Sequence, residues 1–356
     1  MIRMKKILLA TTALAFVAAH ASAVDVELYG QVNKGLFAYD DGESTDFVVQ
    51  DNALSSTRFG VKGAQVLDNG LTASVLLEGE MTSNASDELT QNPASSTGTN
   101  SATPLSSGGD FTERQARVGL SGAFGGVYLG QQSTAIDGVL TQDLVGAQDV
   151  MSADYARIGG GYQLRSSAGA LSGVTVGELT SGIAQSRDDS IRYDSPIFAG
   201  FQARASVAQG GDTEGSVFYD GASGDFKLKG AAGVRMVNSG ETGDNLSAQY
   251  AASISAAHTS GLGGTLAYDR ADNADAWYAK VGYAWDAYEV AADYGTNDDM
   301  LSGVSSSELE SYGLGAQYNL GNGVSVAGLY RNYDAKVSGV SSQDIDLYGV
   351  NMRVKF

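Results

Sequence analysis

The sequence predicts an all-β protein: a single transmembrane antiparallel β-barrel of roughly 16 strands. Three observations predict this fold. Short segments that alternate between apolar and polar residues recur along the 356-residue chain. Glycine is frequent, with 47 residues, and proline occurs only 3 times, as suits twisted strands joined by tight turns. Beyond the N-terminal stretch, no run approaches the ~18 apolar residues that a membrane-spanning helix requires.

Residues 1–23 read MIRMKKILLATTALAFVAAHASA, with basic residues at Arg3, Lys5 and Lys6 before an apolar run. This pattern predicts a secretory signal peptide that is cleaved after Ala23. A membrane anchor fits less well, because the apolar run is short and ends in small residues. Without this segment the chain has 19 basic and 41 acidic residues, a net charge near −22, which argues against nucleic acid as a partner. The absence of cysteine excludes a disulfide scaffold and thiol chemistry.

Residues 24–356 are predicted to form one domain, the barrel. The first strand covers Val26–Tyr39, with Val26, Leu28, Val32 and Leu36 on one face. Further alternating segments lie near residues 56–63, 71–80, 191–194, 201–207 and 348–356. In the segment 71–80, Leu76 is an apolar residue on the otherwise polar face. Alternation over ~10 residues is expected of a barrel strand that faces lipid on one side and water on the other.

Connection lengths support a barrel more strongly than alternation does. The short links VLDNG, SGAFGG, DSPIFAG, DGASGD, TSGLGG, AWDAY and NLGNG are rich in turn residues. Longer polar segments lie between them, around residues 40–54, 82–110, 133–189, 210–214, 238–245, 271–275, 297–308 and 335–343. Strict alternation of short and long connections is expected when one rim has tight turns and the other has loops. About 16 strands would enclose an aqueous channel.

The segment 133–188 has no alternation long enough to cross a membrane. Connections of this length with little regular structure are usually functional or disordered. We interpret it as a constriction loop that folds into the pore, and a mobile surface flap is the alternative.

The chain resembles the general porins of Gram-negative outer membranes. The resemblance is carried by VELYGQVNKGL, STRFGVKG, DNGLTASVLLEGE, RQARVGLSGAFGGVYLGQQST, SIRYDSPIFAGF, SYGLGAQYNLGNGVSVAGLYRNYD and YGVNMRVKF. It implies a 16-stranded outer-membrane barrel that forms a homotrimer, with the third extracellular loop folded into the lumen. It also implies that the terminal Phe356 is the signal for the outer-membrane assembly machinery. The chain departs from the family at Tyr128 and Gln131, where porins commonly have basic residues.

Charges on the loop and on the wall are the candidate site of such a pore. The loop acids are Asp137, Asp143, Asp149 and Asp154, of which Asp143 and Asp149 are the preferred candidates. The basic wall residues that alternation places inward are Arg58, Lys62, Arg117, Arg192 and Arg204. Arg114 has the parity of the lipid-facing Val118, so we expect it at the rim. Opposite charges across a narrow gap create a transverse field that favours small polar solutes.

The predicted function is passive diffusion of small hydrophilic solutes and ions, with a preference for cations because the chain is acidic. A substrate-specific channel for an anion or a sugar is the alternative function. A secreted soluble β protein is a third possible interpretation of the sequence. An enzyme is not expected, because His258 is the only histidine after the predicted signal and there is no cysteine. No cofactor or metal is expected. The acidic stretches ADNAD and GTNDD have no EF-hand spacing.

Overall fold

The computed structural model describes residues 25–91, 110–180, 187–238, 248–301, 303–340 and 342–356. The predicted signal peptide and its cleavage position at Ala23 lie outside these residues. Within the described part, no helix is both long enough and apolar enough to span a membrane.

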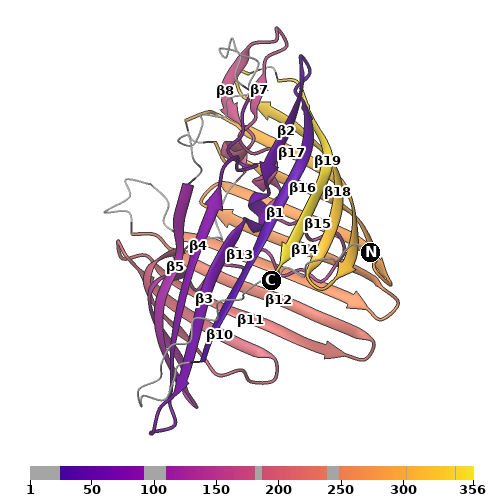
Figure 1. Cartoon of the computed structure of the whole chain (residues 1–356). Coiled ribbons are helices and arrows are strands. Elements are labelled where there is room, and N and C mark those ends of the chain that lie inside the picture. Colours follow the sequence, from indigo (N-terminus) through magenta and orange to yellow (C-terminus); the bar gives the residue numbers. More distant parts are fainter. Residues whose placement is uncertain (1–24, 92–109, 181–186, 239–247, 302, 341) are drawn as a thin grey trace, which may run out of the picture.

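Strands make up almost all of the described structure (Figure 1). The first half of the chain contains β1 (Asp25–Asp40), β2 (Thr45–Asp51), β3 (Arg58–Val66), β4 (Thr72–Thr82), β5 (Asp110–Gly122), β6 (Gly125–Ser133), β7 (Gln163–Arg165) and β8 (Leu171–Thr175). The second half contains β9 (Arg187–Asp194), β10 (Phe201–Ala208), β11 (Thr213–Ser223), β12 (Phe226–Met236), β13 (Ala248–His258), β14 (Leu262–Ala271), β15 (Ala274–Trp285), β16 (Tyr288–Asp298), β17 (Ser307–Gly321), β18 (Val324–Val337) and β19 (Ile345–Lys355). Three short 3₁₀ turns are η1 (Ala53–Ser55), η3 (Tyr155–Arg157) and η4 (Gly177–Leu179).

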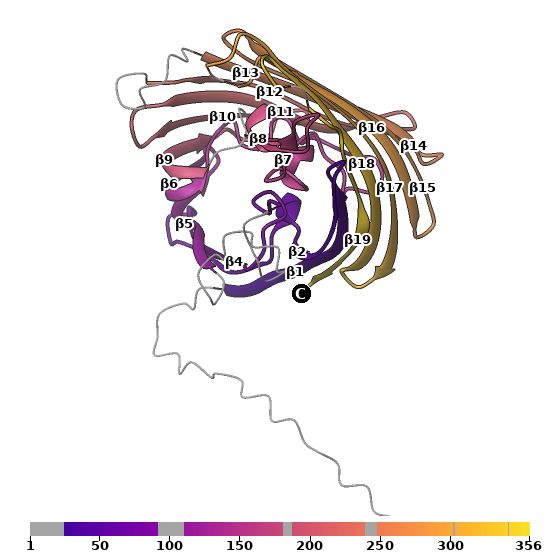
Figure 2. The same cartoon turned by 90° about the horizontal axis from the view of Figure 1, so that it is seen from above.

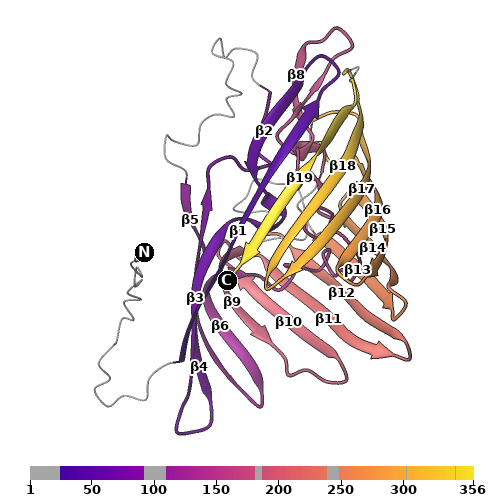
Figure 3. The same ribbon diagram turned by 45° about the vertical axis from the view of Figure 1, so that its right-hand side comes forward.

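The strands close into an antiparallel barrel, because β1 pairs with β19 as well as with β2 and β3 (Figure 3). Seventeen strands belong to this sheet, but β2 and β3 pair with successive halves of β1 and occupy one place. The barrel therefore has 16 positions, and the predicted fold is confirmed. The short β7–β8 pair forms a separate two-stranded sheet near one rim.

The predicted alternation holds along the wall. Val26, Leu28 and Leu36 point outward and are 66%, 64% and 50% exposed, whereas Phe37 and Tyr39 point inward and are buried. Outward apolar side chains face lipid, and inward ones face the lumen or whatever fills it.

The first predicted connection, residues 40–54, differs from the expectation. Its central part is β2, which pairs with β1, so the turn between them covers only residues 41–44. Phe47 and Val49 point outward while Val48 is buried, which is ordinary strand alternation. Seven residues between polar segments were too short to recognise as a strand from the sequence.

The long central segment folds into the barrel interior. Residues 134–180, here called the lumen loop, lie within one side of the barrel when it is viewed along its axis, and β4, β5 and β6 form the opposite side (Figure 2). Its side chains form the main buried core of the protein together with inward residues of β1, β2 and β14–β19.

Candidate functional site

The backbone of the lumen loop is hydrogen-bonded to wall side chains, strand after strand. Its amides donate from Ala135 to Ser206 of β10 (2.8 Å), from Leu144 to Ser255 of β13 (2.9 Å), from Ala147 to Glu289 of β16 (3.0 Å) and from Asp149 to Gln317 of β17 (3.1 Å). Polar wall residues thus replace water as partners of an irregular backbone. This arrangement fixes residues 135–149 along half of the inner wall.

Two of the loop acids take part in this attachment. Asp143 forms an ion pair with the buried Lys280 of β15 and accepts a hydrogen bond from Thr265 of β14 (2.7 Å). Asp149 is 1% exposed and forms an ion pair with Arg353 of β19. Both carboxylates are therefore neutralised by the wall, and Asp149 has almost no contact with lumen water. Since these partners lie more than a hundred residues away, spacing in the sequence could not reveal them.

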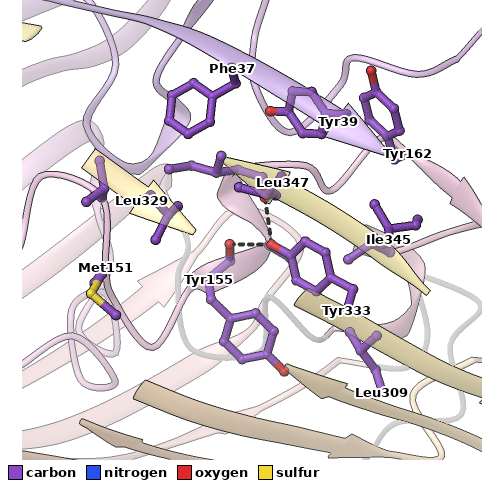
Figure 4. Packing of buried hydrophobic residues seen from close by; sticks show 14 of the residues in the cluster. Phe37, Tyr39, Met151, Tyr155, Tyr162, Leu309, Leu329, Tyr333, Ile345 and Leu347 are labelled. Carbon is purple, nitrogen blue, oxygen red and sulfur yellow. Dashed lines mark hydrogen bonds between the residues drawn. The ribbon is translucent and has the colours of Figure 1, made fainter. Parts of the chain in front are cut away.

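Apolar packing holds the next part of the loop. The Tyr333 hydroxyl of β18 donates to the carbonyl oxygen of Tyr155 (3.0 Å), as Figure 4 shows, and to that of Ile158 (2.6 Å). Gly295 of β16 gives the ring of Tyr155 its space, because a Cβ there would lie 2.3 Å from a ring carbon. The loop therefore fits into the inner wall with the tight packing of a protein core.

A buried ion pair lies beneath this packing. Arg331 of β18 is 1% exposed and donates to Asp293 of β16 (2.7 Å) and to Ser311 (3.0 Å). The Tyr278 hydroxyl donates to the same carboxylate (3.0 Å), and the guanidinium carbon lies 5.3 Å from the ring centroid of Tyr155. This network ties four strands, β15 to β18, to the lumen loop.

The opposite side of the lumen is lined by charge. Arg114 of β5 donates to Glu78 of β4 (2.9 Å) and forms an ion pair with Glu80. Arg58 of β3 lies 3.4 Å from Glu78. The expectation that Arg114 lies at the rim is wrong. A β-bulge opposite Glu78 and Gly79 makes Arg114 an extra residue, which reverses its parity and turns it inward.

The lumen is narrowed by more than the lumen loop. Residues 83–91, which follow β4, also fold inward, where the Ser86 carbonyl accepts from the Gly159 amide (2.8 Å). Arg157 of the lumen loop joins the two segments by pairing with Asp154 (2.9 Å) and with Asp87 (2.8 Å). Asp154, and to a lesser degree Asp87, raises the pKa of Arg157 above its usual range, so this guanidinium stays charged. No pattern in SNASDEL distinguished this segment from an ordinary extracellular loop.

A polar cavity of about 260 Å³ lies where these elements meet. Its charged lining residues, here called the constriction set, are Glu80, Asp87, Glu88, Arg114, Asp154, Arg157 and Arg187. The set combines both signs of charge within one narrow space. Asp154 belongs to it directly, whereas Asp143 contributes to a neighbouring polar cavity lined by Leu54, Gln148 and Ser152.

The family of the chain follows from comparison with known proteins. A family model described as Gram-negative porin matches residues 10–338. The chain belongs to the Gram-negative porins. It is 30% identical over 208 residues to the major outer membrane protein P.IB of Neisseria sicca, an alignment that covers 57% of this chain and 46% of that protein. The chain therefore spans about half the length of this curated relative.

Solved structures show the same fold. The anion-selective porin from Comamonas acidovorans matches with a TM-score of 0.62 at 19% identity, over 94% of this chain and 100% of that one. A trimer form of OmpT from Vibrio cholerae gives 0.57 at 17% identity over 94% and 100%. The channel DcaP of Acinetobacter baumannii gives 0.58 at 12% identity over 94% and 97%. This family and fold are those of multi-stranded barrels of the outer membrane, and they are channels rather than enzymes.

The other predicted wall residues of this porin lie nearer the rim of short turns. Lys62 pairs with Glu27 (3.0 Å), and both side chains are exposed. Arg117, Arg192 and Arg204 project from β5, β9 and β10, and the guanidinium carbons of Arg117 and Arg192 lie 4.4 and 5.4 Å from the ring centroid of Tyr128. The structure thus separates the predicted basic residues into Arg58, near Arg114, and a second group further along the wall.

Two further predicted residues remain to be placed. Asp137 is half-buried in the lumen loop, with its carboxylate in electrostatic range of Arg187 and Arg204. Phe356 exchanges two backbone hydrogen bonds with Gly30 (both 3.0 Å), so the last residue takes part in closing the barrel.

Proposed function

We propose that this porin is a channel for passive diffusion of small hydrophilic solutes and ions across the outer membrane. The observation that carries the proposal is the polar cavity bounded by the constriction set, inside a closed barrel. Carboxylates and guanidinium groups that face each other across a narrow space align water and disfavour apolar solutes. Small polar solutes replace some of that water and pass.

The two kinds of charge have different proposed roles. Asp137 and Asp154 from the loop act with Arg58 and Arg114 from the wall on solutes in the narrow part. Asp143 and Asp149 hold the loop in place through their pairs with Lys280 and Arg353. Their effect on selectivity is therefore indirect, through the position of the loop.

A preference for cations is the finer part of the proposal. Within the constriction set the charges nearly balance, with four acids and three arginines. Most of the net charge of −19 must then lie elsewhere. At the strand ends on the long-loop side, Asp275 is the register partner of Asp298 and Asp298 that of Glu308, and these acids have the parity of the outward Trp277 and Tyr294, so they surround the mouth from the outer face. A negative mouth concentrates cations before they enter. The anion-selective Comamonas porin shares the fold at 19% identity, so the sign here rests on the charges of this chain.

The alternative is a substrate-specific channel. The observation that favours it is the group of arginines on β5, β9 and β10, whose charges are only partly neutralised.

A homotrimer is proposed for the assembly. Among described residues, every tyrosine and tryptophan that is exposed on the outer wall lies on β9 or a later strand, such as Tyr193, Tyr250, Trp277 and Tyr348. The outer faces of β1–β6 expose Val, Leu, Met and Phe instead. Tyrosine and tryptophan mark a membrane interface. The outer face of β1–β6 exposes neither, so we propose that this face contacts the neighbouring subunits. Mass measurement in mild detergent tests this, and a monomer would refute it.

Recording in planar bilayers across a salt gradient tests the channel and its selectivity together. Discrete conductance steps are expected, with a reversal potential of the sign that cation flow produces. Absence of steps from correctly folded protein would refute the channel. An anion-selective potential would refute only the cation preference.

Phe356 is the proposed signal for the assembly machinery. Deletion of Phe356 is expected to lower the amount of porin in the outer membrane while export across the inner membrane continues. Normal surface levels of the truncated chain would contradict this role.

A further inference from the structure

Arginines from three strands gather on aromatic rings of the inner wall. This arginine cluster consists of Arg117, Arg192 and Arg204, with Tyr128 and Phe218 as its rings. Arg117 and Arg192 share the ring of Tyr128, and the guanidinium carbon of Arg204 lies 4.0 Å from the ring centroid of Phe218. Stacking on a ring fixes a planar guanidinium without neutralising its charge.

The ring of Tyr128 is held in place by the strand beside it. Gly119 of β5 lies opposite Tyr128 in the sheet, and a Cβ there would lie 2.4 Å from a ring carbon. The ring therefore occupies the space that a side chain would take and lies close against the wall. Its position orients both guanidinium groups.

Paired carboxylates do not balance the charge of the arginine cluster. Asp194 accepts two hydrogen bonds from Arg192, at 2.9 and 3.0 Å. Arg204 bonds to the neutral amide oxygen of Gln202 (3.3 and 3.2 Å), and Nε and Nη1 of Arg117 have no hydrogen-bond partner. Within the described chain, neither Arg117 nor Arg204 has a carboxylate within 4.0 Å, and Asp137 acts on Arg204 only from a longer distance. Three cations thus have one directly paired carboxylate.

The cluster is separate from the constriction. Arg117 follows Arg114 by three residues, about 10 Å along the strand towards the short turns. Of the three arginines, Arg117 alone lines a cavity of about 480 Å³, together with Ser74, Leu76, Asp25 and the Lys62–Glu27 pair. That volume is sufficient for a small organic solute.

Resting on the proposed channel function, we propose that the arginine cluster is a binding station for small dianions, such as a dicarboxylate or hydrogen phosphate. Guanidinium groups bind both through charge-assisted hydrogen bonds. A bound dianion would supply negative charge to Arg117 and Arg204, which Asp194 does not pair with. The acidic mouth governs how often small ions enter, whereas the station would retain a dianion that has entered.

Block of KCl current in planar bilayers tests the station, with succinate and inorganic phosphate as separate probes and uncharged succinamide as the size control. Succinate or phosphate is expected to reduce the current in a saturable manner, and succinamide is not. In Arg117→Gln and in Arg204→Gln, the half-blocking concentration should rise about tenfold, which is ~1.4 kcal/mol. The stronger of the two probes identifies the anion class.

Lys229→Gln is the matched control. The substitution removes one positive charge from the wall, as the arginine substitutions do. Lys229 lies on β12, is 3.7 Å from Asp220 and does not belong to the arginine cluster. Its half-blocking concentration should stay within twofold of the wild type.

An equal rise in Lys229→Gln, or no saturable block in the wild type, would overturn the binding station. If KCl current steps are still recorded, the proposed channel function is unaffected by that result. Loss of KCl steps from folded wild-type protein would overturn the channel itself. Arg204→Gln keeps the test valid if Arg117→Gln does not fold.

Discussion

The two sides of the lumen are built from the same strand alternation but have opposite interiors. On the side of β14–β19, inward positions carry residues such as Ala291, Leu309 and Tyr333, and the lumen loop covers them. On the side of β3–β5, inward positions carry Arg58, Glu78 and other charged residues. Outward residues are apolar on both sides. Only the inward set distinguishes a packed side from an open side.

This difference shows that an inward position in a wide barrel need not be wet. On the packed side, burial of apolar surface holds the loop, and the loop acids pair with Lys280 and Arg353. On the open side, charges pair with each other across strands and remain in reach of lumen water. Loop position and solute selection are therefore controlled by different residues, and the following variants separate them.

Asp293→Ala should have the largest effect, because it acts on the packed side. It leaves the guanidinium of Arg331, 1% exposed, without its carboxylate, and breaking a buried pair costs ~3–5 kcal/mol. Thermal unfolding in detergent, followed by circular dichroism, should occur at a clearly lower temperature. Open-channel current should also become noisier, because Tyr155 of the loop rests on Arg331.

Glu308→Ala is the control for that variant. It removes a carboxylate from an exposed pair with Lys336 (3.5 Å), which solvent screens, so the unfolding temperature should hardly change. Equal shifts in unfolding temperature for the two variants would contradict the difference between the sides.

Gly295→Val should have the next largest effect by overfilling the packed side. Its Cβ would lie 2.3 Å from the ring of Tyr155, and overpacking costs ~1–3 kcal/mol. The loop should move towards the open side, so single-channel conductance should fall. Gly215→Val is the control, since a Cβ at Gly215 meets nothing within 4 Å. Unchanged conductance in Gly295→Val would show that the loop position does not limit the current.

The sequence predicted the wall of the barrel well, because alternation and turn length are local properties. Outward Val26 and Leu28 and inward Arg58 could be assigned from their neighbours alone. Parity failed at Arg114, because a bulge depends on the register of two strands and cannot be read from one. The strand β2 was also missed and taken for part of a connection, since seven residues give too short a pattern.

The candidate site was less predictable than the wall. The acids of the lumen loop were evident from the sequence, but their partners were not. Thr265 lies 122 residues from Asp143, and the separation is larger for Asp149 and Ser325. The inward segment 83–91 was hidden for a related reason, since it is held by a contact with Gly159 that only the closed barrel creates.

Arg114→Gln should change selectivity on the open side more than stability. It leaves Glu78 and Glu80 without their shared partner and makes the lumen more negative by one charge. A unit charge ~6 Å away in water changes the energy of a cation by ~0.7 kcal/mol and that of an anion by the same amount with opposite sign, so the cation-to-anion permeability ratio should rise about tenfold. Reversal potentials measure this change. Lys336→Gln, the same charge change outside the lumen, should leave the ratio unaltered at 1 M salt, and an equal change would place the selecting field outside the constriction.

Asp298→Asn should have the smallest effect and should depend on salt. Asp298 lies at the end of β16 on the long-loop side, beside Asp275 and Glu308, with the parity of the outward Tyr294, and it does not belong to the constriction set. The Debye length falls from ~10 Å at 0.1 M to ~3 Å at 1 M, so a mouth charge acts on entering ions only in dilute salt. The reversal potential of Asp298→Asn should therefore shift slightly towards anions at 0.1 M and coincide with the wild type at 1 M. The shift in Arg114→Gln should persist at both concentrations, because that charge lies within the narrow part of the lumen. If the Asp298→Asn shift also persisted at 1 M, Asp298 would act at short range, and the division between an acidic mouth and a balanced constriction would not hold.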